Sequence, residues 1–199
     1  CLVNNAGFAV PGALEDVPGV AMREVFEVIV HGPHELIRAT MPHLRATGGT
    51  VVNVSSVLGR SAYPGLGAYC SAKFALEGLT DSLRLEVGDA VDVVAVEPAW
   101  VDTDFDEAAR AQLDRVDRSD AYRDLYALYG EDSVLRGGRL AVSPDRVAET
   151  VVEATTAPDP AARYPVGWIA RAIGATRCLP DPIEDWGRRR LAPIVARFL

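Results

Sequence analysis

The chain lacks several features that would assign it to a large class of proteins. No apolar run approaches the length needed to cross a bilayer, and no signal-peptide pattern is visible. Basic residues are too few for a nucleic-acid face, because 20 of them stand against 28 acidic residues and the net charge is −8. We therefore expect neither nucleic acid nor a membrane as the main partner.

Cysteine is scarce, and its pattern excludes two kinds of site. Cys1, Cys70 and Cys178 are odd in number and widely scattered, so they form neither a disulfide framework nor a zinc-type pair. His31 and His34 could share a helix face as a metal pair, but a proline between them disrupts that helix and no third ligand is evident. We expect a cytoplasmic protein without a metal site.

The chain also lacks an initiator methionine. A strand-like pattern begins at the very first residue and covers Cys1–Asn5. We therefore expect a truncated chain from which the first strands of the fold are missing. At 199 residues with 49% hydrophobic content, it can still bury one substantial core, so we expect a single domain over 1–199.

Strand-like and helical segments alternate along the chain. Thr50–Ser55 and Val91–Glu97 are rich in valine, as expected of parallel strands covered on both faces. Val20–Arg45 and Tyr69–Val87 have apolar residues at helical spacing. This alternating order of strands and helices predicts right-handed βαβ units. The expected fold is therefore α/β with a doubly wound parallel sheet.

Proline and glycine mark the interruptions and ends of these elements. Gly32-Pro33 predicts a kink in the first long helix, because proline has no N–H and clashes with the preceding turn. Ser143 is an N-cap candidate, with Pro144 in the first turn of a further helix. Arg163–Gly167 is predicted to be a short last strand, which Pro165 confines to an edge of the sheet.

The segment of about 103–140 is polar and helical only in patches. A long insertion at the carboxyl end of a strand is where such folds place a substrate lid. Tyr122, Tyr126 and Tyr129 either line an apolar substrate pocket or serve as ordinary packing of this lid. The last part, about 168–199, is predicted to be a helical extension that packs on the domain or a second subunit, or lies on a membrane surface.

Ser56, Tyr69 and Lys73 are the candidate catalytic residues. Ser56 follows an apolar strand, whereas Tyr69 and Lys73 stand four residues apart at the start of a helix and so face the same way. A nearby positive charge lowers the pKa of a phenol, which lets it exchange a proton with an alcohol or carbonyl oxygen. Taken alone, the pair has an ordinary alternative as a half-buried aromatic beside a solvated lysine.

Four motifs agree in order and spacing with one known pattern. Asn4-Asn5-Ala6-Gly7 stands at the end of the first strand, Ser56 precedes Tyr69 by thirteen residues, and Lys73 follows by four. The fourth motif is Pro98-Ala99-Trp100-Val101-Asp102-Thr103. Over residues 1 to about 105 the chain thus resembles the short-chain dehydrogenase/reductase family, whose fold is Rossmann-like with three layers, α/β/α. The later part resembles the branch that handles steroids, retinoids and other hydrophobic alcohols.

The resemblance implies a role for each matching residue. Tyr69 would be the general acid/base, Ser56 would orient the substrate oxygen, and Lys73 would lower the pKa of the tyrosine and bind the nicotinamide ribose. The implied cofactor is NAD or NADP, which supplies the hydride chemistry. The implied cofactor contacts are Asn4, Ala6, Gly7, Tyr69, Lys73, Pro98, Val101 and Thr103. The first three would lie on the adenosine side, and the last three would wall the nicotinamide.

Three departures from the family pattern stand out. Ile29 occupies the place of an asparagine that holds a water in the family's proton path, so proton relay would be slow or rerouted. Ala99 replaces a glycine, which requires only that the backbone there avoid positive φ. The Gly-rich dinucleotide turn is absent, since Gly65-Leu66-Gly67 lacks a third glycine and is interpreted as a loop. The chain by itself is therefore expected to bind cofactor weakly or not at all.

The sequence predicts an NAD(P)-dependent oxidoreductase that acts on CH–OH donors, interconverting a hydrophobic secondary or long-chain alcohol and its carbonyl. The alternative is a non-catalytic homologue that serves as a scaffold or partner-binding subunit, favoured by Ile29 and the missing Gly-rich turn. A third alternative, the extended relatives acting on nucleotide sugars, is opposed by the motif at Asn4–Gly7. The family habit of pairing through two long helices implies a homodimer or homotetramer.

Overall fold

The computed structural model describes residues 1–130, 133–176 and 182. Its centre is a parallel sheet in the order β1 (Leu2–Asn4), β2 (Thr50–Val54), β3 (Asp92–Pro98) and β4 (Arg163–Val166). Each strand lies beside the next along the chain, as consecutive βαβ units require. The predicted α/β fold with a parallel sheet is confirmed, and β4 lies at an edge, as Pro165 required.

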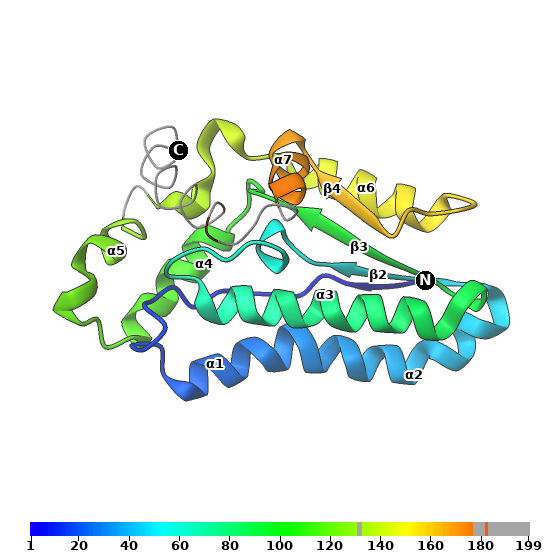
Figure 1. Cartoon of the computed structure of the whole chain (residues 1–199), viewed down its shortest axis with the longest axis horizontal. Helices are drawn as coiled ribbons and strands as arrows, with labels where there is room; N and C mark the ends of the chain where they lie inside the picture. Colours follow the sequence, from blue (N-terminus) through cyan, green and yellow to red (C-terminus); the bar gives the residue numbers. More distant parts are fainter. Residues whose placement is uncertain (131–132, 177–181, 183–199) are drawn as a thin grey trace.

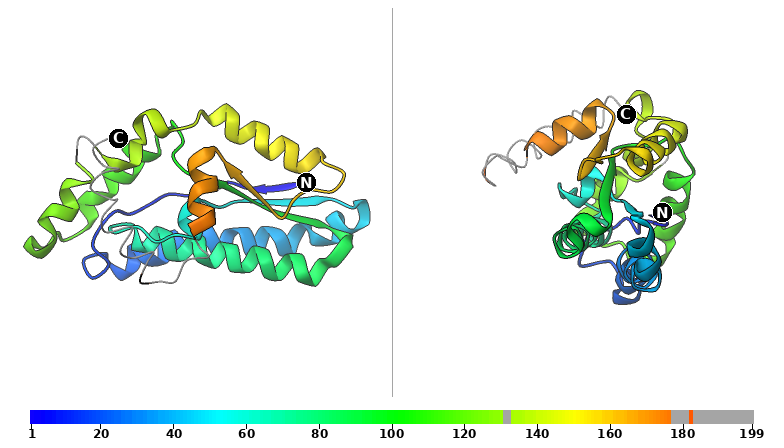
Figure 2. Two further views of the ribbon diagram at one scale, coloured as in Figure 1. Left: turned by 45° about the horizontal axis from the view of Figure 1, so that its top comes forward. Right: turned by 90° about the vertical axis from the view of Figure 1, so that its right-hand side faces the viewer.

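Helices cover both faces of this sheet (Figures 1 and 2). One side carries a long composite helix and α3 (Gly67–Val87), and the other carries α6 (Pro144–Thr156), while α7 (Trp168–Thr176) follows β4. The composite helix consists of α1 (Gly19–Phe26), the π-helical η1 (Glu27–His31) and α2 (Gly32–Thr47). The short elements are η2 (Val57–Gly59), η3 (Gly88–Ala90), α4 (Phe105–Ala111), η4 (Gln112–Arg115), η5 (Asp120–Tyr122), α5 (Arg123–Ala127), η6 (Val134–Arg136) and η7 (Gly138–Leu140).

The side chains of β2 and β3 point alternately to the two faces of the sheet, which explains why helices cover both faces. Val51 and Val93 pack against apolar residues of α2 on one face, together with the end of α3. Their neighbours Val52 and Val94 point to the opposite face and pack against Ala154 of α6. Successive side chains of a strand point to opposite faces, so a run of valines needs cover on both sides.

The predicted kink at Gly32-Pro33 takes the form of a π-helical turn. The helix is not broken there, because η1 joins α1 to α2 without a gap and the Gly32 N–H bonds to the Glu27 carbonyl, five residues back. Pro33 is the second residue of α2 and directly follows this π turn. A π turn is a common way to absorb an interruption in a helix, and such turns are frequent at functional sites.

The predicted lid lies at the end of the sheet toward which the strand arrows point, with α4 and α5 in it (Figure 1). Tyr129 is fully buried in the core, and its hydroxyl donates to the Pro64 carbonyl. Tyr126 donates to Asp16 at 2.7 Å, and the same carboxylate accepts from Ser119, which lowers the pKa of Asp16. Of the two alternatives for these tyrosines, lid packing holds for Tyr126 and Tyr129.

The predicted carboxyl-terminal extension begins as α7 at Trp168. The amphipathic part of that extension, and Cys178, lie outside the described residues. Among the helices that the structure describes, none is both long and apolar enough to span a bilayer. Ser143 caps α6 as predicted, since its hydroxyl accepts from the Arg146 N–H at 3.3 Å.

Two glycines with positive φ give a matched test of this packing. A methyl group on Gly65 (φ +79°) would lie 2.5 Å from Tyr129 Cε2, whereas one on Gly48 (φ +60°) would meet nothing within 4 Å. Gly48→Ala is expected to lower the free energy of unfolding by about 1 kcal/mol from backbone strain alone. Gly65→Ala adds the clash with a core tyrosine and is expected to cost about 3 kcal/mol. Urea unfolding measures both, and equal losses would contradict the packing described.

Candidate active site

A pocket of about 560 Å³ opens where β1, β2 and β3 end. The carboxyl ends of parallel strands meet at one edge of a sheet, and ligands of open α/β folds bind in that crevice. The pocket is lined by Val3, Asn5, Gly7, Val54, Ser55, Ser56, Tyr69, Lys73, Pro98, Ala99, Val101, Thr103, Phe105, Pro144, Val147, Ala148, Val151 and Val152.

Ser56, Tyr69 and Lys73 meet in this pocket, as the sequence predicted they would. Tyr69 and Lys73 are buried on one side of α3, one turn apart, and the Lys73 Nζ lies 5.6 Å from the centre of the Tyr69 ring. Ser56 stands just after β2, and a hydrogen bond links its side chain to that of Tyr69. The Ser56 hydroxyl also accepts from the Leu58 N–H at 3.1 Å, which holds the first turn of η2.

Lys73 is an ammonium group buried at the end of a strand. Its Nζ donates to the Val54 carbonyl at 2.7 Å, and only 3% of the residue is exposed. Burial disfavours the charged form and lowers the pKa of Lys73 to about 8, while the carboxylate of Glu77 opposes this effect. Lys73 is therefore mostly protonated at pH 7 and loses its charge in mildly alkaline solution.

The pKa of Tyr69 moves in the direction opposite to the one predicted from the neighbouring lysine. Burial raises it, and the hydrogen bond with Ser56 only partly offsets this. Phe105 contributes to the burial, because its ring packs edge-on against Tyr69 at 5.6 Å between centroids. A phenol that stays protonated is a proton donor, so at neutral pH the site is prepared to protonate a carbonyl oxygen.

The motif at the end of β1 divides between the core and the pocket. The Asn4 side chain points inward and donates to Asn53 at 2.8 Å, and Asn53 in turn donates to Thr80 of α3 at 2.9 Å. Gly7 lines the pocket, as does Asn5, which was not among the predicted cofactor contacts. Ala6 is exposed beside them. Cofactor contact remains a prediction for Asn4, Ala6 and Gly7.

The second predicted wall of the site follows β3. Pro98, Val101 and Thr103 all line the pocket. Val101 is held by a parallel bridge to Val142, and Thr103 accepts weakly from the Phe105 N–H at 3.4 Å. Ala99 has no positive φ, since within the described ranges only glycines adopt that conformation, so its replacement of glycine is accommodated as predicted.

Several residues that line the pocket belong to none of the four motifs and were not predicted from the sequence. Ser55 and Phe105 are next to motif residues in the chain, and this adjacency was the available signal. Val147 and Val151 come from α6, on the opposite face of the sheet, and only the fold brings them to the pocket.

Ile29 lies deep in the site, on the π-helical turn η1. It is fully buried, and a methyl group placed on Gly7 would touch both the Ile29 Cγ1 and the Lys73 Nζ, each at 3.7 Å. The apolar side chain thus faces the surroundings of Lys73. Nothing in an isoleucine side chain can hold a water by hydrogen bonding.

The buried charge of Lys73 predicts a pH-dependent stability. The pKa is about 8 in the folded protein against 10.5 for a free lysine, so between these values the unfolded chain binds more protons. The free energy of unfolding then rises with pH. From pH 8 to pH 10 we expect wild type to gain on the order of 2 kcal/mol relative to Lys73→Met. Urea unfolding across this range checks it, and a difference that does not change with pH would contradict it.

Comparisons with known proteins agree with this geometry. The family model described as short chain dehydrogenase matches residues 1–114. The uncharacterized oxidoreductase YusZ of Bacillus subtilis is 33% identical over 169 residues, covering 83% of this chain and 60% of that protein. Mouse retinol dehydrogenase 5 is 35% identical over 191 residues, covering 86% of this chain and 58% of that protein.

A solved structure shows the same likeness. A short chain dehydrogenase/reductase from Burkholderia phymatum, crystallised in complex with NAD, has a TM-score of 0.71 and 26% identity, covering 94% of this chain and 66% of that one. The chain therefore spans less than two thirds of the length of these three relatives. With a family model matched over more than half of its residues, the chain belongs to the short-chain dehydrogenase/reductase family.

Proposed function

We propose that this protein is an NAD(P)-dependent oxidoreductase that interconverts a hydrophobic secondary or long-chain alcohol and its carbonyl compound. In this proposal Tyr69 is the general acid/base, Ser56 positions the substrate oxygen, and Lys73 holds a positive charge beside both. The observation that carries the proposal is the meeting of these three side chains in one pocket at the carboxyl ends of the strands.

The residues present fit the nicotinamide end of a dinucleotide. Gly7 has no side chain, which leaves open the space between Ile29 and the Lys73 Nζ. Lys73 would donate to the ribose hydroxyls, and Asn5 and Thr103 supply further polar groups around the pocket. The chain contains no Gly-rich turn for the pyrophosphate. The bound cofactor supplies or accepts the hydride, and the choice between NAD and NADP is left to experiment.

The chain's own residues manage the proton. In the reductive direction, the Ser56 hydroxyl binds the carbonyl oxygen and the Tyr69 phenol delivers its proton as that oxygen gains negative charge. Burial keeps Tyr69 protonated at neutral pH, so the phenol carries the proton that this step needs. In the oxidative direction the same proton returns from the alcohol to the phenolate, which the ammonium of Lys73 stabilises.

A hydrophobic substrate is supported by what lines the pocket beyond the three polar groups. Phe105 packs on Tyr69, and Val101, Val147 and Val151 contribute apolar walls. The likeness to mouse retinol dehydrogenase 5 points the same way, since retinol is an apolar alcohol.

The second candidate function is a non-catalytic homologue. The observation in its favour is Ile29, fully buried where the family usually has a water-binding asparagine. A protein that had lost catalysis would tolerate loss of the Tyr69 hydroxyl, so the first experiment below also decides between the two.

We also propose that the protein forms a homo-oligomer through its long helices. Val28, Leu36 and Phe74 are exposed on the composite helix and on α3, which lie side by side (Figure 1). Large apolar side chains exposed on adjacent helices are typical of a surface covered by another subunit.

The Tyr69 hydroxyl is the first target. In the full-length gene product, assayed with NADH and NADPH over a panel of hydrophobic ketones and aldehydes, Tyr69→Phe is expected to lower kcat/KM by about 100-fold or more. Tyr164→Phe is the matched control, because its hydroxyl accepts from the Ala161 N–H and Tyr164 is not among the residues that line the pocket. Turnover that is absent in wild type, or equal in wild type and Tyr69→Phe, would overturn the proposal that the protein is an oxidoreductase.

The position of Ile29 gives a second test. Ile29→Asn is expected to raise turnover, because an amide can hold the water that an isoleucine cannot. It should also lower the free energy of unfolding by about 2 kcal/mol, since a polar group enters a fully buried site. Ile29→Val removes one methylene without adding polarity and should leave turnover unchanged. A rate in Ile29→Asn that is equal or lower would show that this site works without the asparagine.

A further inference from the structure

Glu77 is a buried carboxylate one helical turn beyond Lys73. The two residues are four apart on α3 and so lie on the same face of the helix. Only 4% of Glu77 is exposed, about as little as Lys73. A carboxylate is rarely buried without a partner, because the loss of hydration must be offset by opposite charge and hydrogen bonds.

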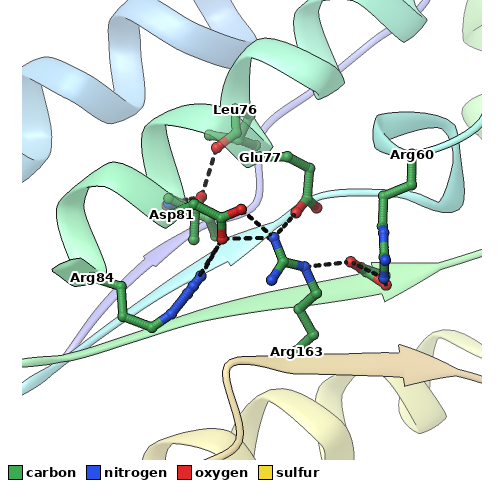
Figure 3. A network of polar contacts seen from close by, with 9 residues as sticks. Arg60, Leu76, Glu77, Asp81, Arg84 and Arg163 are labelled. Carbon is green, nitrogen blue, oxygen red and sulfur yellow. Dashed lines mark hydrogen bonds and ion pairs between the residues drawn. The ribbon is translucent and has the colours of Figure 1, made fainter. Parts of the chain in front are cut away.

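Arg163 of β4 provides part of that compensation (Figure 3). Its Nη2 donates to Glu77 Oε2 at 3.1 Å and to the two oxygens of Asp81 at 2.6 and 2.7 Å. Its Nε lies 3.1 Å from Oε1 of Glu97, which also receives Arg60. One guanidinium therefore joins β4, β3 and α3.

The second oxygen of Glu77 is not used by this network. Within the part of the chain that the structure describes, Oε1 is buried without a hydrogen-bond partner. The turn η2 packs closely on this part of α3, because a methyl group on Gly59 would lie 3.0 Å from Glu77 Cγ and 3.1 Å from the Lys73 carbonyl. In such a poorly solvated environment the charge of Glu77 acts strongly on other nearby charges.

We infer that Glu77, oriented by Arg163, is a positioning residue of the active site that holds Lys73 as an ammonium ion. The inference rests on the proposed function, in which Lys73 must be charged. Glu77 acts through Lys73 and lines no part of the pocket. Arg163 lies beyond the 1–114 segment matched by the family model, so a strand outside that segment contributes to the site.

The other groups around Lys73 do not provide an uncompensated negative charge that would stabilise its ammonium form. On its own helix, Tyr69 is a neutral phenol whose pKa is raised by burial. From β2 comes the Val54 carbonyl, and from η1 comes the apolar Ile29. Glu97 of β3 is paired with Arg60 and Arg163, and burial followed by repulsion from Glu77 raises its pKa.

Asp81 provides a matched control. It lies one further turn along α3 and binds the same Nη2 of Arg163, yet its side chain is 45% exposed and it stands eight residues from Lys73. Asp81→Asn removes one carboxylate from the network, as Glu77→Gln does. Only Glu77→Gln removes the buried carboxylate that stands one helical turn from Lys73.

The experiment measures the titration of Lys73 directly. Lysine labelled with ¹³C at Cε gives NMR signals that titrate with pH, and the signal of Lys73 is assigned by its loss in Lys73→Met. In the full-length gene product, wild type is expected to titrate near pH 8. In Glu77→Gln the midpoint should fall by about one pH unit, because an opposite charge nearby is lost. Asp81→Asn should titrate as wild type does.

An unchanged midpoint in Glu77→Gln, or an equal fall in Asp81→Asn, would overturn the inference. If Glu77→Gln fails to fold, Glu77→Asp is used instead. It retracts the carboxylate by one methylene and should lower the midpoint by a smaller amount, and an unchanged value there overturns the inference as well.

The pH profile of kcat/KM is the second readout. Its alkaline limb should move to lower pH in Glu77→Gln and stay in place in Asp81→Asn, which a merely structural role would not produce. The two proposals fail in different ways. If wild type shows no turnover but the Lys73 midpoint still falls in Glu77→Gln, only the proposed oxidoreductase activity is contradicted. If turnover is normal but the midpoint does not change in Glu77→Gln, only the proposed role of Glu77 is contradicted.

Discussion

A buried ammonium ion ties helix α3 to the end of strand β2. The bond from Lys73 Nζ to the Val54 carbonyl is 2.7 Å long, and it sets the register of the helix against the sheet. Ser56 stands two residues beyond Val54, and Tyr69 one turn before Lys73, so the same bond brings the serine and the phenol together. An unpaired buried cation is costly, which is why this contact constrains the structure so strongly.

Low solvation then governs the chemistry of the site. Burial favours the neutral forms of both Tyr69 and Lys73, raising the pKa of the phenol and lowering that of the amine. The groups that oppose this are Ser56 for Tyr69 and Glu77 for Lys73. The arrangement keeps a proton on the phenol and, at pH 7, on the amine, which suits the delivery of a proton to a carbonyl oxygen.

Predictions from the local sequence were correct where a single property of a residue, such as its strand preference or its missing N–H, decided the local structure. Valine-rich runs became β2 and β3, Ser143 caps α6, and Pro165 lies in an edge strand. The direction of the Tyr69 pKa was predicted wrongly, because it depends on desolvation by groups such as Phe105, thirty-six residues away in the chain. Likewise, alternation along an extended segment puts one of two successive asparagines inside and the other in the pocket, and the sequence does not say which.

The sequence by itself determined the order of the elements, the family and the three side chains of the site, because these depend on hydrophobic period and on motif spacing. The tertiary structure decided which charges face one another. Arg163 meets Glu77 and Glu97 only because β4 adds to the sheet beside β3 and points its guanidinium at α3 (Figure 3). Contacts between residues more than sixty positions apart leave no local pattern, since they depend on how strands are placed in the sheet rather than on neighbours in the chain.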